Sequence, residues 1–322
     1  MKDYLVFGGC FRSEVEFPDL SPAVGSQAPD WELRLETSDP PEPVALQGTR
    51  WIEPEWVFRL YSVKGGLRLD YGGVGSFGIF SAGREIVWYP GSEPESPEIR
   101  LEMARAIVLG PVMALVLRQA GILCLHGSAV TLNGQGAAFL APKFHGKSTL
   151  ALALTAAGGR LLTDDLVAID PGPRPVVFPG VHSVRVMHDI AERLIPRFPQ
   201  ATATHGFKTT LTEFPSSDLA WEPAPLTAIY FIEPLGGMED GRAVSREPLT
   251  PTRAAAALAQ GKKLADSLIG STDAGAMLES IVSVSLRVPV YRMPIMRDLE
   301  RLSEAVDEIM AWHGMTAEPR AD

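Results

Sequence analysis

The segment from residue 136 to residue 154 constrains the fold most, because it joins a strand-like apolar run to a helix through one short loop. It reads GAAFLAPKFHGKSTLALAL, and its loop follows the phosphate-binding pattern G-x-x-x-x-G-K-[ST] at the last three positions, which are Gly146, Lys147 and Ser148. Ala141 stands where the first glycine of the pattern belongs. If that position requires a positive φ angle, alanine costs about 1 kcal/mol or more.

A strand, a tight loop and a helix in this order predict an anion site. The unpaired amide N–H groups at the helix start and the positive end of the helix dipole converge on one point. Lys147 is expected to reach the β- and γ-phosphates of ATP, and Ser148 to bind Mg²⁺. The other loop candidates for nucleotide contact are Lys143, Phe144, His145, Gly146 and Thr149. The alternative is an ordinary helix start with Lys147 in solvent.

A pair of aspartates follows the loop at a separation that can bring it back beside the loop. The run RLLTDD ends in Asp164 and Asp165, 17 and 18 residues after Lys147, so a helix of about ten residues and a returning strand place the pair beside the loop. We expect them to bind Mg²⁺, Asp165 together with Ser148, and to accept a proton from an attacking hydroxyl. The sequence does not decide which aspartate has which role. Alternatively, the pair only ends a strand.

His126, in the run CLHGSAV, lies 21 residues before Lys147 on the strand that precedes the loop strand. A single histidine on an apolar strand is commonly a hydrogen-bonded core residue. Its position in the hairpin that leads to the loop also makes it a candidate to contact phosphate or to orient an aspartate.

Composition excludes several other classes. The formal net charge is −10, with no long basic run, so no nucleic-acid partner is expected. The apolar run from residue 106 to residue 117 contains Pro111 and is too short to span a bilayer, so we expect a buried helix that is kinked or broken there and no membrane partner. Cys10 and Cys124 lack metal-ligand spacing, and the N-terminus has no export signal, which predicts a cytoplasmic protein.

The pattern of elements predicts two regions. Residues 1–95 contain short apolar or alternating runs split by glycine pairs, which indicates a β-rich region. Residues 96–322 alternate between helix and strand, which predicts an α/β or α+β domain. There the strands are expected in ILCLHGSAVTL, GAAFLA, RLLTDDLVAID, LTAIYFIEP and VPVYRMPI, and the helices in IRLEMARAIVLGPVMALVLRQ, KSTLALALTAAGG, TRAAAALAQGKK and DLERLSEAVDEIMAWHG.

From His126 to Asp165 the chain resembles the catalytic domain of the HPr kinase/phosphorylase family. The 40 residues HGSAVTLNGQGAAFLAPKFHGKSTLALALTAAGGRLLTDD align without a gap to that family's His-Gly, G-x-S-G-x-G-K-S and Asp-Asp landmarks. The resemblance implies a P-loop-containing fold related to the nucleotide core of phosphoenolpyruvate carboxykinase. It also implies that the positions of Lys147 and Ser148 bind ATP and Mg²⁺, and that the aspartates supply a metal contact and the base that activates a serine hydroxyl.

More of the chain is similar to the stand-alone branch of that family, which includes kinases that act with peptide-tailoring enzymes, such as those that modify lasso peptides. The runs LGPVMALVLRQAGILCLHGSAV and FPGVHSVRVMHDIAERL carry this similarity, which makes Arg185 a candidate to stabilise transferred charge. Lys208 in GFKTTL is a second candidate, and both could equally be surface cations. The family has glycine at the positions of Ala141 and Phe144, and the E-x-R-G-x-G signature of enzymes that act on HPr is missing here.

These features together predict an ATP-dependent kinase that transfers the γ-phosphoryl group to a hydroxyl of a peptide, protein or small molecule, with serine as the expected acceptor. An oligomer is compatible with the sequence. The alternative is a non-catalytic module whose altered loop binds nucleotide weakly or not at all and that presents a surface to a peptide or protein. A transport-type or motor ATPase is disfavoured, since no L-S-G-G-Q-like signature follows the loop.

Overall fold

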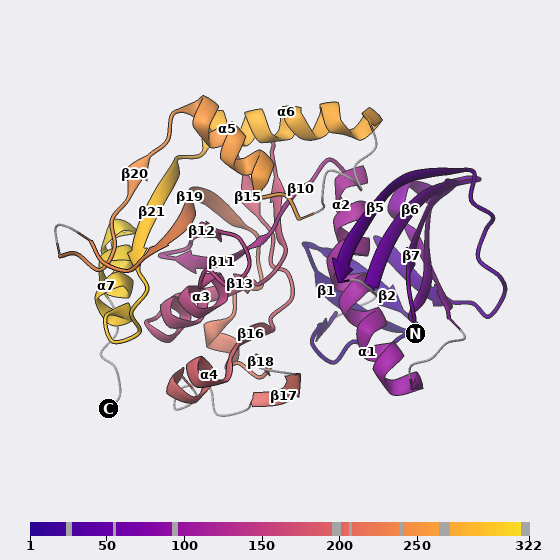
Figure 1. The fold of residues 1–322 in the computed structure, drawn as a ribbon, viewed down its shortest axis with the longest axis horizontal. Coiled ribbons are helices and arrows are strands. Elements are labelled where there is room, and N and C mark those ends of the chain that lie inside the picture. The colour runs from indigo at the N-terminus through magenta and orange to yellow at the C-terminus, as the bar shows by residue number, and fades with distance from the viewer. Residues whose placement is uncertain are drawn as a thin grey trace. The chain divides into compact units, whose positions relative to one another are not determined.

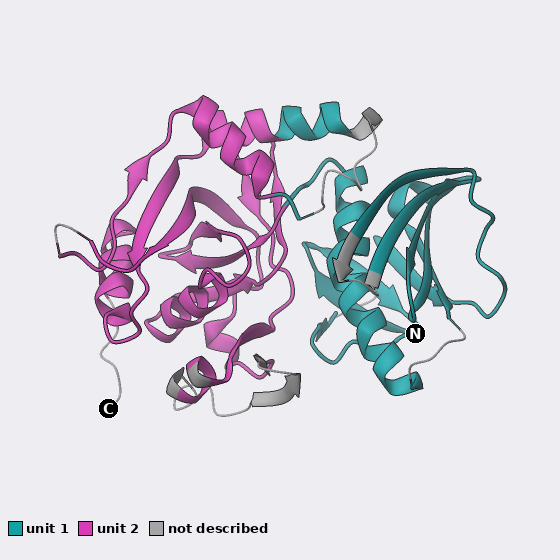
Figure 2. Ribbon diagram, in the orientation of Figure 1, with its two compact units in different colours: residues 1–124, 262–280 teal, residues 125–261, 281–322 magenta. Residues whose placement is uncertain are grey.

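The computed structural model describes residues 1–23, 28–53, 56–91, 96–194, 201–205, 208–238, 241–263 and 271–316. The chain has a mixed α/β architecture with large sheets and few helices (Figure 1). It divides into two compact units: the first contains Met1–Cys124 and Lys262–Ser280, and the second contains Leu125–Gly261 and Ile281–Asp322 (Figure 2).

The first unit is built on a mostly antiparallel sheet. Within the described residues this sheet has nine strands in the order β3-β1-β2-β4-β9-β8-β7-β6-β5, and β4 runs parallel to both of its neighbours. The strands are β1 (Lys2–Val6), β2 (Gly9–Ser13), β3 (Ser21–Pro22), β4 (Trp31–Leu35), β5 (Ala45–Glu53), β6 (Trp56–Val63), β7 (Gly66–Tyr71), β8 (Gly75–Phe80) and β9 (Glu85–Pro90). Fully buried side chains such as Phe11, Leu33 and Phe77 form its core. These nine strands all lie within residues 1–90 of the described chain.

The apolar run around Pro111 is helical, as expected. Helix α1 (Pro97–Ile107) begins where the Ser96 hydroxyl accepts a hydrogen bond from the amide of Ile99, and it leads through the π-helical segment Val108–Val112 into α2 (Met113–Gln119). Proline has no N–H to donate, so the widened turn lets the helix continue past Pro111. By compactness these helices group with the N-terminal strands. The expected boundary between residues 95 and 96 therefore differs from the division into compact units, and it stays a prediction.

The second large sheet carries the phosphate-loop segment. Its main path, within the described residues, is β10-β14-β15-β19-β12-β11-β13, and β21 pairs with both β19 and β20. The strands are β10 (Leu123–Leu125), β11 (Gly127–Leu132), β12 (Gln135–Leu140), β13 (Arg160–Thr163), β14 (Val167–Asp170), β15 (Val176–Val177), β19 (Ala224–Leu235), β20 (Glu247–Pro248) and β21 (Val290–Met296). Because β12, β19 and β21 are parallel, their carboxyl ends meet at one edge, where the loop after β12 lies.

The remaining helices and a small sheet complete the chain. The helices are α3 (Lys147–Ala156), α4 (His188–Leu194), α5 (Pro251–Gln260), α6 (Ser271–Arg287) and α7 (Leu302–Trp312), and the three-stranded sheet contains β16 (Val184–Met187), β17 (Ala201–His205) and β18 (Lys208–Leu211). The predicted helices that became α3, α5 and α7 and the predicted strands at β19 and β21 are confirmed, but α6 was not predicted. No helix in the described part of the chain is both long and apolar enough to cross a membrane.

Two predicted strands are wrong as continuous elements. The run ILCLHGSAVTL was expected to be a strand with His126 on it, but β10 ends at Leu125 and β11 starts at Gly127, so His126 lies in the bend between them. The run RLLTDDLVAID was expected to be a single strand, but β13 ends at Thr163 and β14 starts at Val167. Asp165 has a φ angle of 69°, in the left-handed region, which cannot be part of an extended strand. Because the strand ends before these residues, the side chains of Asp164 and Asp165 point in different directions.

Helix α3 is held rigidly, because it is buried on most of its surface. Its residues from Leu150 to Thr155 are all buried, and the helix contacts β11, β13, β16 and α7. The sequence STLALALTA has no charged side chain after Lys147, which suits a helix that is covered nearly all round. The position of its first turn is thus fixed by the core of the second unit.

Candidate functional site

The loop between β12 and α3 has the local geometry of an anion site. Gly146 takes the left-handed conformation (φ 81°) immediately before the first helical residue, and open space surrounds the place where a side chain would be. The amide groups of the first turn of α3 therefore face a loop whose final residue carries no Cβ to obstruct a ligand. Gly127 is required for space, because a Cβ there would clash with the Leu140 side chain and lie 2.7 Å from the carbonyl oxygen of Phe139.

Lys147 is buried, with 6% of its surface exposed, and its amine is held inside the loop. The Nζ atom donates hydrogen bonds to the carbonyl oxygens of Ala141 and Pro142, both at 2.9 Å. The alternative of a lysine in solvent is therefore wrong for this structure. An ammonium group at a helix start, inside a loop that wraps around it, supplies the positive charge that a phosphate requires.

The loop differs from expectation at two residues. Ala141 does not adopt a positive φ angle, so alanine in place of the first glycine carries no left-handed strain. Phe144 does, with a φ of 65°, and its ring is 61% exposed. Lys143 is also exposed, and its carbonyl oxygen lies 2.8 Å from Nδ1 of the half-buried His145. The strain of this loop thus lies at Phe144 and not at Ala141.

Asp164 lies between two serine hydroxyl groups. Ser148 donates to both carboxylate oxygens, at 3.0 and 2.9 Å, and Ser128 donates to Oδ1 at 2.5 Å. Burial raises the pKa of the Asp164 carboxyl, the Ser128 hydrogen bond lowers it, and the nearby charge of Asp165 raises it. Since Ser148 directly follows Lys147, this carboxylate lies at the same helix start as the amine. The sequence had paired Ser148 with Asp165, whereas the hydrogen bonds pair it with Asp164.

The side chain of Asp165 has different partners from that of Asp164, because the chain turns between β13 and β14. Its Oδ1 lies 3.1 Å from Nδ1 of His126, whose Nδ1 is also 3.2 Å from the Asp165 carbonyl oxygen. Its Oδ2 lies 4.0 Å from Nη2 of Arg185 on β16. The Asp165 side chain is 42% exposed, so an external group can reach it. The other ring nitrogen of His126, Nε2, is buried and has no hydrogen-bond partner in the described part of the chain.

The structure thus brings most of the predicted residues together. Lys147, Ser148, Asp164, Asp165 and His126 share one end of α3, and Arg185 reaches the edge of this group with a side chain that is 57% exposed. Thr149 is half-buried in the first turn of α3. Lys208 begins β18, opposite Met187, but its side chain lies outside the described residues.

Sequence reasoning missed Ser128. This residue is fully buried on β11, and its only signal was a hydroxyl in a mostly apolar strand that also contains Thr131. Its contact with Asp164 depends on the pairing of β11 with β13, in which Ala129 lies opposite Thr163. A local pattern cannot show that register.

The donor set fits a Mg²⁺–nucleotide. Mg²⁺ prefers oxygen ligands and is commonly held by one or two carboxylates together with substrate phosphates. The Ser148 hydroxyl and the Asp164 carboxylate supply such oxygens, and the orphaned Nε2 of His126 could bond a polar group of a ligand. The described residues contain no cluster of three or more His, Cys, Asp or Glu that could hold a metal ion.

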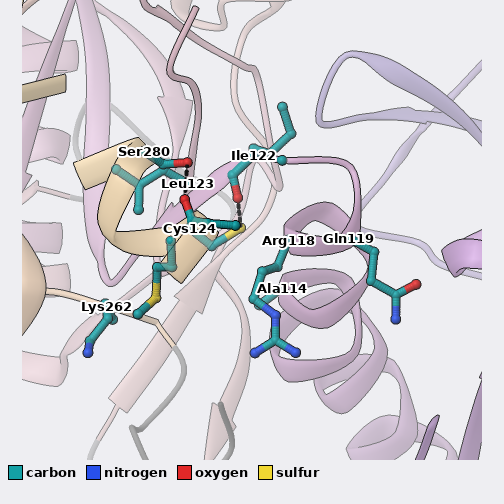
Figure 3. Close-up of a pocket in the computed structure, with 11 residues that line it drawn as sticks. Ala114, Arg118, Gln119, Ile122, Leu123, Cys124, Lys262 and Ser280 are labelled. Carbon is teal, nitrogen blue, oxygen red and sulfur yellow. Dashed lines mark hydrogen bonds between the residues drawn. The ribbon is translucent and has the colours of Figure 1, made fainter. Parts of the chain in front are cut away.

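A small cavity of about 80 Å³ lies in the first unit, apart from these residues (Figure 3). Arg118, Gln119, Cys124 and Lys262 are among the residues that line it. Burial raises the pKa of the Cys124 thiol to about 12, so this cysteine is a protonated and poorly nucleophilic group at neutral pH.

Comparison with known proteins adds little to this geometry. A scan against protein-family models gives no match. A search of curated proteins gives none either. Among solved structures, the chain is similar to the Hpr(Ser) kinase/phosphatase from Coxiella burnetii, with a TM-score of 0.31 and 11% identity over 59% of this chain and 89% of that chain.

Proposed function

We propose that this protein is an ATP-dependent phosphotransferase that moves the γ-phosphoryl group to a hydroxyl acceptor. One observation carries the proposal. The buried amine of Lys147, the hydroxyl of Ser148 and two aspartates with different surroundings meet at the start of one rigid helix. Phosphoryl transfer needs mainly positioning and charge stabilisation, which is what these groups supply.

The buried part of the site would hold the nucleotide. Lys147 and the first amides of α3 would bind the phosphates, and Ser148 with Asp164 would hold Mg²⁺. When bound, Mg²⁺ neutralises charge on the β- and γ-phosphates. Ser128 keeps the Asp164 carboxylate in place through its hydrogen bond. Asp164 is thus our metal ligand in place of Asp165, because its oxygens already meet the Ser148 hydroxyl.

The exposed part of the site would meet the acceptor. Asp165 is accessible, and its carboxylate is oriented by His126 and lies near Arg185. We assign Asp165 as the base that accepts the proton of the acceptor hydroxyl, since a base must be within reach of that proton. Arg185 would stabilise charge on the transferred group. A serine of a peptide or protein is the acceptor implied by the resemblance to the stand-alone kinases.

Nucleotide binding is the first test. Calorimetric titration with Mg-ATP should give heat with the wild-type protein and a dissociation constant at least about tenfold weaker with Lys147→Ala, since a charge-assisted hydrogen bond contributes about 1.5–3 kcal/mol. Lys64→Ala, at an exposed lysine of the first unit, is the matched control and should bind like wild type. No heat with wild type would instead favour a non-catalytic module.

Transfer is the second test. We expect label from γ-³²P-ATP to appear in free serine or in serine-containing peptides. Asp165→Asn should lower the transfer rate by about 10²–10⁴-fold while Mg-ATP still binds, because only the base is lost. Asp39→Asn changes an exposed aspartate of the first unit and serves as the control. Full transfer activity in Asp165→Asn would contradict the assignment of the base.

A further inference from the structure

Helix α6 is apolar on the side that faces away from its own core. Leu278, Val282 and Leu286 are 56%, 40% and 65% exposed, and they follow one another at intervals of four residues. The opposite side of the same helix is anchored by the buried residues Ile281 and Val284. Residues four apart lie above one another on a helix, so the three exposed side chains form one continuous row, which we call the α6 stripe.

The geometry of the α6 stripe is fixed by the helix itself. Helix α6 is one continuous helix although the division between the compact units falls within it (Figure 2). A row at four-residue spacing is one of the side-chain ridges through which helices pack against one another in globular proteins. Isolated exposed apolar residues are ordinary, but three in register on one helix mark an interaction surface.

We propose that the α6 stripe is the contact between two copies of this chain, packed antiparallel about a two-fold axis at Val282. In such a symmetric interface each surface meets itself. Val282 then lies against its counterpart in the second copy, and Leu278 of each copy lies against Leu286 of the other, because these leucines are equally spaced on either side of Val282.

The charges beside the stripe agree with this arrangement. Glu279 and Arg287 are exposed, and they are the charged residues of α6 whose side chains the structure describes. Each directly follows a stripe leucine, so both lie on the same flank. The two-fold axis brings Glu279 of each copy to Arg287 of the other, which gives two opposite-charge pairs in the dimer. The guanidinium already points back along the helix, donating to the Ser283 hydroxyl at 2.7 Å.

The dimer should be of moderate strength. One helix crossing another buries less than the roughly 1,600 Å² of a standard interface, so a dissociation constant on the order of 10 μM is expected. Sedimentation velocity from about 1 to 200 μM would then show a monomer converting to a dimer. A monomer at every concentration overturns the proposal, and so does a stripe that binds phosphatidylcholine vesicles while the protein stays monomeric.

Leu286→Glu tests the apolar contact. It should raise the dissociation constant by at least about tenfold, because a leucine is lost from each side and two carboxylates are buried. Val44→Glu makes the same kind of change at a side chain that is 72% exposed in the first unit, and it should leave the dimer intact. Unchanged circular dichroism and melting temperature show that both variants fold. A dimer that Leu286→Glu does not weaken contradicts the proposed surface.

A charge swap tests the antiparallel register. Glu279→Arg and Arg287→Glu should each weaken the dimer by about two- to fivefold, since each puts like charges opposite one another twice. The double variant restores opposite charges and should return to within about twofold of the wild type. A double variant that is no tighter than either single one overturns the register. Because these experiments need no nucleotide, their outcome is separate from that of the kinase assays.

Discussion

Phe144→Gly should stabilise the protein, although it removes a large side chain. Phe144 holds a φ of 65° at a loop position where the resembled family has glycine. A left-handed conformation costs a residue with a Cβ roughly 1–2 kcal/mol, and glycine avoids that cost. Glycine also makes the unfolded state more flexible, which lowers the free energy of unfolding by about 0.5–1 kcal/mol. The net gain is therefore about 0.5–1 kcal/mol.

Phe144→Ala is the matched variant, because it removes the same ring and keeps the backbone strain. The ring is mostly exposed, so its own burial contributes little. Glycine should melt about 1–4 °C above alanine in differential scanning calorimetry, given about 2–4 °C per kcal/mol for large domains. If the glycine variant melts at or below the alanine variant, the backbone at this position is not strained and the argument fails.

The remaining predictions concern buried polar groups. Burial lowers the pKa of His182 to about 4, so the unfolded chain binds this proton more readily, and stability is lost as the pH falls from about 6.5 toward 4. The contribution lost between pH 8 and pH 5 is about 2 kcal/mol, and urea titrations should show His182→Gln losing that much less than wild type over this range. Asp164→Asn should raise the melting temperature at pH 7, because burial raises the pKa of this carboxyl and the amide carries no charge, while Mg-ATP binding weakens; a lower melting temperature would contradict this. Ser128→Ala removes one of the two hydroxyl groups that donate to the buried Asp164 carboxylate and should cost about 1–3 kcal/mol in urea unfolding; a change below about 0.5 kcal/mol would show that the hydrogen bond matters little.

Local patterns predicted the hairpin and the helix of the site well. The turn at Asn133 and Gly134 has φ angles of 51° and 73°, as an Asn-Gly hairpin turn requires. Helix α3 ends just before Gly158, which has a φ of 105°. These features depend on short-range chemistry, since glycine and asparagine adopt positive φ angles more readily than other residues. The resemblance placed Lys147, Ser148 and the aspartates together for the same reason, because their separations are set by one helix and one strand.

Long-range geometry could not be predicted in the same way. Because the chain turns at Asp165, the two neighbouring carboxylates have different partners. The Asp-Asp sequence alone does not indicate this turn. Ser128 contacts Asp164 only through the pairing of β11 and β13. Helix α6 was missed because serine and valine are frequent in STDAGAMLESIVSVSLR, and both have weak helix propensity. Packing of Ile281 and Val284 holds this helix in place.

One magnesium–nucleotide site is proposed to unite the start of α3 with the two aspartates. A crystal structure with Mg²⁺ and a non-hydrolysable ATP analogue tests it most directly. We expect a metal about 2.1 Å from the Ser148 hydroxyl and an Asp164 oxygen, the γ-phosphate at Lys147, and Asp165 open to solvent on the far side of that phosphate. A nucleotide bound elsewhere, or a metal held without Ser148 and Asp164, would contradict it.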